Sequence, residues 1–409
     1  MTGRARANGE GSIFPYRNGF AAYTWVRTPD GRRKKKWVYG KTRDAVHDKW
    51  IKLQGQARDG VVATTSPSLA AYLTYWLTEI IRPNRAPLTY QTYETFVRVH
   101  ITPTLGVKNL GRLTIRDVQT WVNRLAVTCQ CCVQGKDTRR PEKARRCCAT
   151  GRCCGQTLSR RAVSDIRACL RSALSHAVTE ELISKNVATH VTLPKSRRRA
   201  RRRQAWTTDE ARAFLESART DLDPLYAAYV LVLVLGLRKG EVLGLCWDDL
   251  DLDAGNLAVT LQLQRVGRQL LHRETKTEGS DADLPLPSIC TAALRLRRTE
   301  QSRARDHVGS AWHADKLVFT TRYGTPIEPR NFNRSWDARC AKASVRKITV
   351  HDGRRSCGTL LADLDVHPRV AMQILRHADF SLTMEVYTLA SSASTRAALK
   401  KLGESLDEL

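Results

Sequence analysis

Long apolar runs are absent from this sequence. None of its 409 residues belongs to an apolar stretch of about 18 residues, the length a bilayer-spanning helix needs, so we expect no membrane segment. The first residues, Met1-Thr-Gly-Arg, lead into no apolar core of the kind that a secretion signal requires. These two absences predict a cytoplasmic protein.

Acidic residues are also scarce. Asp and Glu number 40 against 68 for Lys and Arg, which gives a formal net charge of +28, with a pI near 10.1. Such an excess indicates a polyanionic partner. The charge alone would also fit a ribosomal or a membrane-surface protein. The length predicts two or three domains with ample core.

Disulfides are not expected, because the compartment is reducing, although the chain has 12 cysteines. Five of them are scattered and predicted to be buried (Cys169, Cys246, Cys290, Cys340, Cys357). The other seven lie within one hydrophilic insertion, residues 128–156, and their density suggests a tetrahedral zinc site. Their spacing is not that of a standard zinc finger, and a redox-sensitive loop without metal is the alternative. These seven are Cys129, Cys131, Cys132, Cys147, Cys148, Cys153 and Cys154.

Six residues of the second half have the chemistry needed to act on a phosphodiester. Two arginines would clamp the phosphate in planar, permanently charged forks, and two histidines would donate to it or move protons. A lysine would protonate the leaving oxygen, and a tyrosine would attack and hold the cut strand. Such catalysis is mainly electrostatic and needs no metal. The residues are Arg238, Lys276, His351, Arg354, His377 and Tyr387.

Local context strengthens this interpretation. In Leu235-Gly-Leu-Arg-Lys-Gly-Glu-Val, Arg238 is predicted to lie at a junction between two helices, where Glu241 can orient it. A glycine at 240 is expected to precede the second helix. His351 and Arg354 are three residues apart on one helix, so both can point at one target. A helix is expected to end near His377, with a second short helix carrying Tyr387.

At these positions the chain resembles the tyrosine recombinases, the lambda-type phage integrases. The order, spacing and context of the motifs match that family over about residues 206–395. The resemblance implies that Arg238 and Arg354 bind the scissile phosphate and that Glu241 supports Arg238. It implies further that Lys276, on a β-hairpin whose returning strand is Asp283–Pro287, assists the leaving 5′-hydroxyl. His351 would transfer protons, His377 would donate to the phosphate, and Tyr387 would form a 3′-phosphotyrosine bond.

Two departures from the family pattern and one competing assignment accompany the match. Gly353 stands where the family often has leucine, and Arg376 stands where glycine usually precedes the histidine. Lys239 also lies near Arg238 and competes with Lys276 for the role of the lysine.

Residues 9–60 are expected to form a small DNA-binding domain of three strands and a helix, like the arm-type domain of some integrases. Hairpins are predicted at Asn18-Gly19 and Asp30-Gly31, and Thr42 should cap the helix. The basic run at the second hairpin is either a solvated edge or a contact to phosphates. That run is Arg32, Arg33, Lys34, Lys35 and Lys36.

Residues 68–194 are predicted to be helical, with caps at Ser68, Thr114 and Ser159. The helix expected over residues 89–101 should end at Pro103 and Gly106. This part resembles the core-binding domain of the family, although a plain helical bundle fits the pattern too. A basic linker at 195–205 is expected to be disordered through repulsion between its own charges, and in a clamp around DNA it would also follow the phosphates, so both interpretations can hold. Its basic residues are Lys195, Arg197, Arg198, Arg199, Arg201, Arg202 and Arg203.

The sequence therefore predicts a multidomain α+β protein: a small sheet-plus-helix domain, a helical core-binding domain, and a mainly helical catalytic domain (206–409) with a small β-sheet. An amphipathic helix after Ser391 would pack on a neighbouring protomer or on its own domain. The expected function is site-specific integration of a phage or mobile element without ATP or a catalytic metal, in the cytoplasm at the nucleoid. Expected partners are double-stranded attachment sites, three further copies of the chain in a tetramer, a DNA-bending host factor and an excisionase. A type IB topoisomerase and a catalytically inactive DNA-binding regulator are the alternatives.

Overall fold

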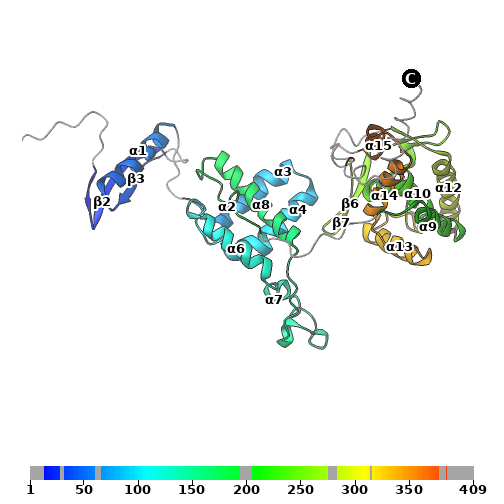
Figure 1. Cartoon of the computed structure of the whole chain (residues 1–409), viewed down its shortest axis with the longest axis horizontal. Helices are drawn as coiled ribbons and strands as arrows, with labels where there is room; N and C mark the ends of the chain where they lie inside the picture. Colours follow the sequence, from blue (N-terminus) through cyan, green and yellow to red (C-terminus); the bar gives the residue numbers. More distant parts are fainter. Residues whose placement is uncertain are drawn as a thin grey trace, which may run out of the picture. The chain divides into compact units, whose positions relative to one another are not determined.

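The computed structural model describes residues 13–27, 32–59, 66–193, 205–274, 283–313, 316–376 and 384. The chain divides into two compact units, residues 1–198 and 199–409 (Figure 1). The predicted multidomain α+β class is confirmed. Among the described residues, no helix combines the length and the apolar character that a membrane crossing requires.

The first unit begins with a three-stranded antiparallel sheet and one helix. The strands β1 (Phe14–Tyr16), β2 (Gly19–Arg27) and β3 (Arg33–Gly40) follow in that order, and α1 (Arg43–Asp59) packs on one face. Thr42 caps α1 as predicted, since its Oγ1 accepts from the Ala45 N–H at 3.3 Å. The first hairpin prediction was wrong by one residue. Gly19 is paired with Tyr16, so the turn is Arg17-Asn18, with Arg17 at a φ of 50°.

The rest of the first unit is a helical bundle. Its main helices are α2 (Leu69–Tyr75), α4 (Pro87–Phe96), α6 (Ile115–Val127) and α8 (Arg160–Thr179), with α3 (Arg82–Asn84) between α2 and α4. π-helical segments, Trp76–Ile81 and Val97–Ile101, extend α2 and α4. The predicted end at Pro103 was wrong, because the chain continues as α5 (Thr102–Leu105). The predicted end at Gly106 is confirmed, since Gly106 is the C-cap of α5. Pro103 lies in the first turn of α5, where a missing N–H is tolerated.

Side-chain caps fix the starts of these helices as expected. Ser68 Oγ accepts from the Ala71 N–H at 3.2 Å, and Ser159 Oγ accepts from the Ala162 N–H at 3.1 Å. Thr114 and Asp117 form a reciprocal capping box on α6. Each such cap satisfies donors that a helix start otherwise leaves unpaired, a contribution of about 1 kcal/mol.

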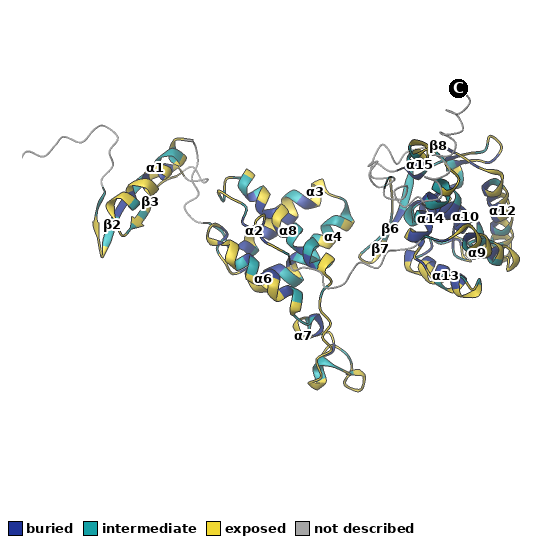
Figure 2. Ribbon diagram, viewed as in Figure 1, coloured by how far each residue is buried: buried dark blue, intermediate teal, exposed yellow. Residues whose placement is uncertain are grey.

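The cysteine-rich insertion leaves the bundle between α6 and α8 and carries the short helix α7 (Gln130–Gln134) near its base (Figure 1). Its two ends are joined by a hydrogen bond from the Gln130 N–H to the Gln156 carbonyl at 2.8 Å. Most of its residues are exposed or only partly buried (Figure 2). The insertion therefore lacks an apolar core of ordinary size.

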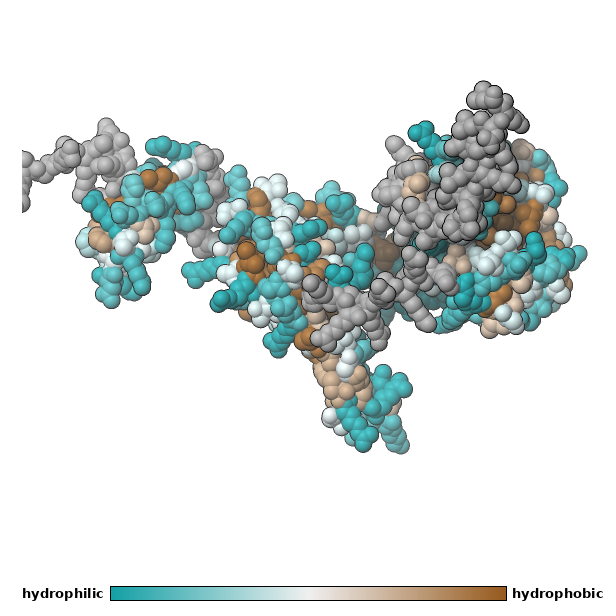
Figure 3. Space-filling view, in the orientation of Figure 1, coloured by the Kyte–Doolittle hydropathy of each residue, from teal (hydrophilic) through white to brown (hydrophobic). Residues whose placement is uncertain are grey.

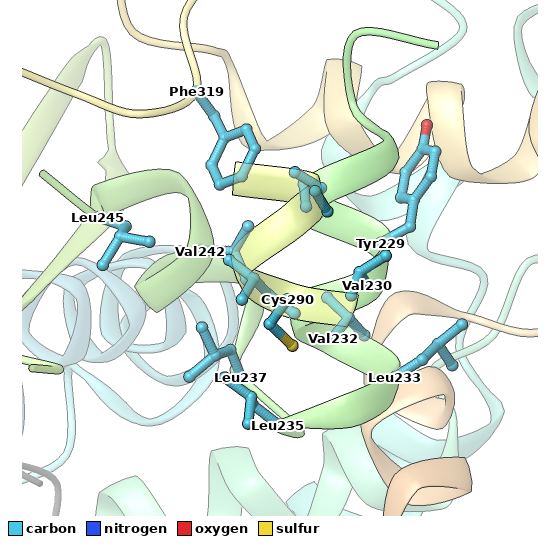
Figure 4. Close-up of a cluster of buried hydrophobic side chains, with 14 of the residues drawn as sticks. Tyr229, Val230, Val232, Leu233, Leu235, Leu237, Val242, Leu245, Cys290 and Phe319 are labelled. Atoms are coloured by element: carbon cyan, nitrogen blue, oxygen red, sulfur yellow. The ribbon is translucent and has the colours of Figure 1, made fainter. Parts of the chain in front are cut away.

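The second unit is mainly helical. Its helices are α9 (Thr208–Thr220), α10 (Tyr226–Val234), α11 (Lys239–Gly244), α12 (Ser288–Val308), α13 (Pro329–Lys342), α14 (Val350–Asp363) and α15 (Pro368–Leu375). α10 is buried along almost its whole length and contacts α9, α12 and α14. Figure 4 shows side chains of α10 and the segment after it, from Tyr229 to Leu245, packed with Cys290 and Phe319. This core holds α11, α13 and α14, the helices that meet at the site.

Two small sheets complete the second unit. β4 (Leu250–Asp251), β5 (Asn256–Ala258) and β8 (Asp283–Pro285) form one antiparallel sheet in that order. β6 (Leu261–Val266) and β7 (Gln269–Glu274) form a separate hairpin. The expectation that Asp283–Pro287 returns against the strand before Lys276 was wrong, because β8 is paired with β5.

Candidate active site and DNA-binding surfaces

The second unit contains a cleft of ≈ 380 Å³ in which α11, α13 and α14 meet. It is lined by the two predicted clamp arginines, Arg238 and Arg354, and by His351. Lys239 and Asn333 also line it, and so does the edge of Trp336. Three of the six predicted catalytic residues thus converge on one opening from two segments that are more than a hundred residues apart in sequence.

Arg238 is the N-cap residue of α11, and Glu241 in the first turn holds it. Its Nη1 donates to Glu241 Oε1 at 2.7 Å, and its backbone N–H donates to Oε2 at 2.8 Å. Its Nη2 donates to the carbonyl of Arg376 at 3.1 Å. The helix starts at Lys239, so the expectation that Gly240 precedes it was wrong, and Gly240 lies inside the first turn. The Arg238 side chain remains 40% exposed, with its guanidinium fixed at the cleft.

Arg354 is buried and held by carbonyl groups. Nη1 donates to the carbonyl of Gly236, and Nη2 donates to the carbonyl of Leu375. A guanidinium has five N–H donors, so these two bonds leave three for a ligand in the cleft. Burial, and then the nearby charge of Arg238, lowers the pKa of Arg354. An anion placed between the two arginines would remove this repulsion.

Arg376 is a third arginine at the site, and sequence reasoning gave it no role. It ends α15 at a φ of 50°, in the left-handed region that glycine adopts without cost. Its Nη2 donates to Glu241 Oε2 at 2.7 Å, and the two side chains are only 1% and 4% exposed. A buried ion pair therefore explains how arginine stands where the family usually has glycine.

The net charge of this group follows from its members. Burial alone would raise the pKa of Glu241, but Arg376 and Arg238 outweigh it and lower the pKa below its usual range. Glu241 is therefore ionised at neutral pH. Three guanidiniums and one carboxylate leave two net positive charges, which suits a phosphorus centre that gains negative charge in its transition state.

Glycines allow the close approach that this arrangement needs. Gly236 has a φ of 58°, and a Cβ there would lie 2.6 Å from Leu375 Cδ2. Its carbonyl is one of the two that hold Arg354. At Gly353, a Cβ would lie 2.8 Å from Trp336 Cη2, so the buried Trp336 ring occupies the space that a leucine would fill.

The start of α14 supplies further groups. Thr349 and Asp352 form a capping box, which fixes the first turn where His351 lies. His351 is exposed at the cleft, whereas Arg354, on the same helix face, is buried. The positive end of this helix adds to the attraction for an anion. On the other side, Lys239 Nζ donates to Asn333 Oδ1 at 3.2 Å, and burial lowers the pKa of Lys239.

The remaining predicted catalytic residues, Lys276, His377 and Tyr387, lie outside the described residues. The described chain reaches β7 at Glu274, two residues before Lys276, and Arg376, one residue before His377. The basic residues of the linker at 195–205 and the amphipathic segment after Ser391 also lie outside the described residues.

The N-terminal sheet has an exposed face of aromatic and basic side chains. Tyr23 lies opposite Trp37 in the register, with ring centroids 4.9 Å apart, and Trp25 lies opposite Lys35. Lys35 Nζ is 4.6 Å from the centroid of Tyr23 and 5.2 Å from that of Trp25. Of the predicted basic run, Arg33 also lies over Trp25.

The other basic residues of that run differ in orientation. Strand alternation turns Lys34 and Lys36 to the opposite face, on which α1 packs, and burial lowers the pKa of Lys36. Arg32 precedes the strand. Only alternate residues of the run therefore belong to the aromatic face.

All seven cysteines of the insertion gather at its base. The Sγ atoms form two sets of four, each within 4.8 Å: Cys129, Cys132, Cys148 and Cys153, and Cys131, Cys147, Cys148 and Cys154. This clustering of thiols is a donor set able to hold a metal ion. The five scattered cysteines are buried, as predicted.

Comparisons with known proteins agree with this geometry. Residues 204–393 match the Phage integrase family, and residues 68–126 match the Phage integrase, N-terminal SAM-like domain. The chain belongs to the phage integrase family. It is thus a tyrosine-type site-specific recombinase, and the matched region spans all six predicted catalytic positions.

Two relatives cover most of the chain. An integrase of Streptomyces ambofaciens is 25% identical over 382 residues, covering 89% of this chain and 88% of the relative. A tyrosine recombinase XerC-like protein of Caldanaerobacter subterraneus subsp. tengcongensis is 24% identical and covers 88% of this chain and 90% of the relative.

Solved structures show the same fold. The Tn1549 transposon integrase in complex with transposon right end DNA has a TM-score of 0.63 at 18% identity, covering 82% of this chain and 99% of that one. A lambda integrase dimer bound to a COC′ core site has a TM-score of 0.52 at 16% identity, covering 78% and 95%.

Two residues at or beside the cleft were missed or undervalued. Asn333 is one exposed polar residue on α13, and its sequence neighbours gave no signal. Arg376 was visible only as a departure from the family pattern. A buried arginine beside a motif histidine is a signal only once its partner, Glu241, is known.

Proposed function

We propose that this protein integrates a phage or other mobile element by cutting and rejoining DNA at specific attachment sites through a 3′-phosphotyrosine at Tyr387. The observation that carries the proposal is the arginine clamp. Arg238 and Arg354 face one cleft, and each guanidinium is held by groups other than the substrate. Clamps fixed in advance stabilise a transition state without reorganising.

The proposed reaction conserves the phosphodiester bond energy. The Tyr387 hydroxyl gives its proton to His351 and attacks phosphorus, and the bond from phosphorus to the 5′ oxygen breaks. The leaving oxygen takes a proton from Lys276, with Lys239 as the competing donor. A 5′-hydroxyl of the partner strand then reverses the step. His351 transfers protons and His377 donates to the phosphate, so neither ATP nor a catalytic metal ion is required.

DNA binding and catalysis would be divided among four parts of the chain. We assign arm-type DNA binding to residues 9–60, core-site binding to 68–194, a connecting basic linker to 195–205, and catalysis to 206–409. The aromatic face with Arg33 and Lys35 supports the first assignment, since guanidinium and ammonium groups beside aromatic rings suit phosphate and groove contacts. The linker arginines and lysines would follow the phosphates.

The assembly would be a tetramer on two DNA sites, aided by a DNA-bending host factor and, for the reverse reaction, an excisionase. Its substrate places the enzyme at the nucleoid in the cytoplasm. The cysteine-rich insertion would hold structural zinc, which the clustering of its thiols supports.

A nicked attachment-site duplex tests the chemistry directly. A nick beside the cleavage point releases a short fragment and traps the covalent intermediate. With chelator present and ATP absent, the wild type should form a denaturant-resistant protein–DNA adduct and Tyr387→Phe should not. An adduct with Tyr387→Phe would mean another nucleophile, and tight binding by both without adduct would support the inactive regulator. Cleavage and relaxation without any site requirement would support the topoisomerase.

A further inference from the structure

The seven sulfurs of the insertion are spaced like the corners of metal–thiolate tetrahedra. Cys148 Sγ lies 3.8 Å from Cys129 Sγ in one set of four and 3.7 Å from Cys154 Sγ in the other. Cys129 and Cys154, which belong to different sets, are also 3.8 Å apart, so the two sets meet beside Cys148. Cys131 is 3.9 Å from Cys147, and Cys132 is 3.6 Å from Cys153. Zn–S bonds of about 2.3 Å put the sulfurs of a tetrahedral site roughly 3.8 Å apart. A disulfide would need about 2.05 Å.

The number of sulfurs points to two ions. Two four-coordinate ions that share no ligand need eight thiolates, and two that share one ligand need seven. The insertion has seven, and its two sets of four overlap at a single residue, Cys148. One mononuclear site would use four cysteines and leave three thiols crowded against it without a function.

The backbone of the insertion is organised around the shared cysteine. Asp137 is fully buried, and its carboxylate accepts from the N–H groups of Cys147 at 3.0 Å and Ala149 at 3.1 Å, on both sides of Cys148. Arg140 pairs with the same carboxylate at 3.0 Å. The turn that presents Cys148 is therefore fixed by a polar anchor, because no apolar core is available.

The surrounding charge suits a cluster of two ions. Seven thiolates and two divalent ions carry three net negative charges. The same insertion supplies basic side chains able to balance them, and Figure 3 shows hydrophilic side chains gathered at its tip. These basic residues are Lys136, Arg139, Arg140, Lys143, Arg145, Arg146 and Arg152.

We propose that the insertion holds a binuclear zinc–thiolate cluster in which Cys148 bridges the two ions. Cys129, Cys132 and Cys153 complete the first tetrahedron, and Cys131, Cys147 and Cys154 complete the second. The inference rests on the proposed structural zinc and adds its nuclearity and its bridge. Two ions joined by one sulfur cross-link α7, the Cys147–Cys148 turn and the Cys153–Cys154 segment, and so replace the missing core.

Metal content of the full-length protein is the first test. Elemental analysis after gel filtration should give two zinc ions per chain in the wild type. Cys153→Ser and Cys154→Ser, which each remove a terminal ligand of a different ion, should each lower this toward one. Cys148→Ser should lower the affinity of both ions. Cys246→Ser, outside the insertion, is the matched control and should retain two.

Cadmium-113 NMR tests the bridge itself. The cadmium-substituted protein should show two resonances split by mutual scalar coupling, which requires a shared sulfur, and Cys148→Ser should abolish the coupling. The binuclear cluster would be overturned if the wild type held one ion per chain and only one of Cys153→Ser and Cys154→Ser lost it. Structural zinc would then still stand. Two uncoupled resonances would overturn the bridge. Absence of bound metal would overturn the structural zinc as well. It would not affect the proposed recombination chemistry, which adduct formation by Tyr387 tests separately.

Discussion

Arg376 donates from Nη2 to Glu241 Oε2 at 2.7 Å, across 135 residues of sequence, in a pair that solvent hardly reaches. Because the same carboxylate holds Arg238, the pair joins a residue without a predicted role to the phosphate clamp. A buried ion pair is costly to break from one side, since the remaining charge is left without compensation.

The first prediction separates the stability of this pair from its function. Glu241→Gln should lower the free energy of unfolding by about 3–5 kcal/mol, because the buried Arg376 loses its anion. The double variant Glu241→Gln/Arg376→Met should recover most of that loss, since no buried charge remains. Strand cleavage should stay low in both, because Arg238 has lost its support. Denaturant titration and adduct formation measure the two effects, and additive stability losses would contradict the prediction.

The second prediction concerns the clamp. Arg354→Lys should reduce the rate of adduct formation by about 10²–10³-fold, because an ammonium cannot contact two carbonyls and a phosphate in a planar fork. Arg305→Lys, at the exposed end of α12, should leave the rate unchanged. Single-turnover cleavage of a nicked duplex at saturating enzyme measures chemistry apart from binding. A tenfold weaker affinity with unchanged rate would place Arg354 in binding alone.

The third prediction decides between the two lysines. If Lys276 protonates the leaving oxygen, Lys276→Ala should be inactive on normal DNA and active on DNA with sulfur in place of the bridging 5′ oxygen. A thiolate leaves without a proton, so this substrate bypasses the acid. Lys239→Ala should be rescued less. The reverse pattern would assign the proton to Lys239, which already lines the cleft.

The fourth prediction concerns acid stability of the helical bundle. Hydrogen bonds from Lys108 and Thr114 lower the pKa of Asp117 to about 2 from an ordinary value of 3.8. A lowered pKa in the folded state stabilises the fold fully above pH 3.8, and the contribution is lost as pH falls toward 2. Asp117→Asn should therefore cost about 1 kcal/mol at pH 7 and progressively less below pH 3.8. Denaturant titrations of the two proteins at several pH values give this difference, and a constant difference would refute the assignment.

The fifth prediction uses strand alternation as its control. Lys35→Ala, on the aromatic face of the N-terminal sheet, should weaken binding to arm-type DNA and reduce the slope of log affinity against log salt by about 1. Lys34→Ala, the exposed neighbour on the face packed by α1, removes the same charge and should change the slope less. Fluorescence anisotropy at several salt concentrations measures both. Equal effects would mean that the basic run acts only as diffuse charge.

The sequence made some elements predictable and others not. Caps at Thr42, Ser68, Thr114 and Ser159 depend on local hydrogen bonds, so spacing was enough to place them. The pairing of β8 with β5 depends on contacts distant in sequence, and local pattern suggested the wrong partner. A helix end was predicted at Pro103 because proline is disfavoured inside a helix. Pro103 instead lies in the first turn of α5, where proline is tolerated.

The site divides in the same way. Arg238 and His351 could be picked out because each lies in a short, recognisable sequence motif. The roles of Arg376 and Asn333 depend on contacts with Glu241 and Lys239, which are distant in sequence and come close only on folding. Gly353 appeared as a departure from the family pattern, and its reason is the ring of Trp336 across the core. Departures of this kind are informative when a distant side chain accounts for them.

The carbonyls of Leu375 and Arg376 hold Arg354 and Arg238, and the chain continues from there to His377 and Tyr387. The clamp and the proposed nucleophile Tyr387 are therefore linked through the chain that follows Arg376. Coupling between two equilibria is reciprocal. If phosphate binding favours one position of Tyr387, then placing Tyr387 in that position must strengthen phosphate binding by the same free energy. A partner protomer that favours or disfavours this position of Tyr387 would therefore change the affinity of the active site for the DNA phosphate.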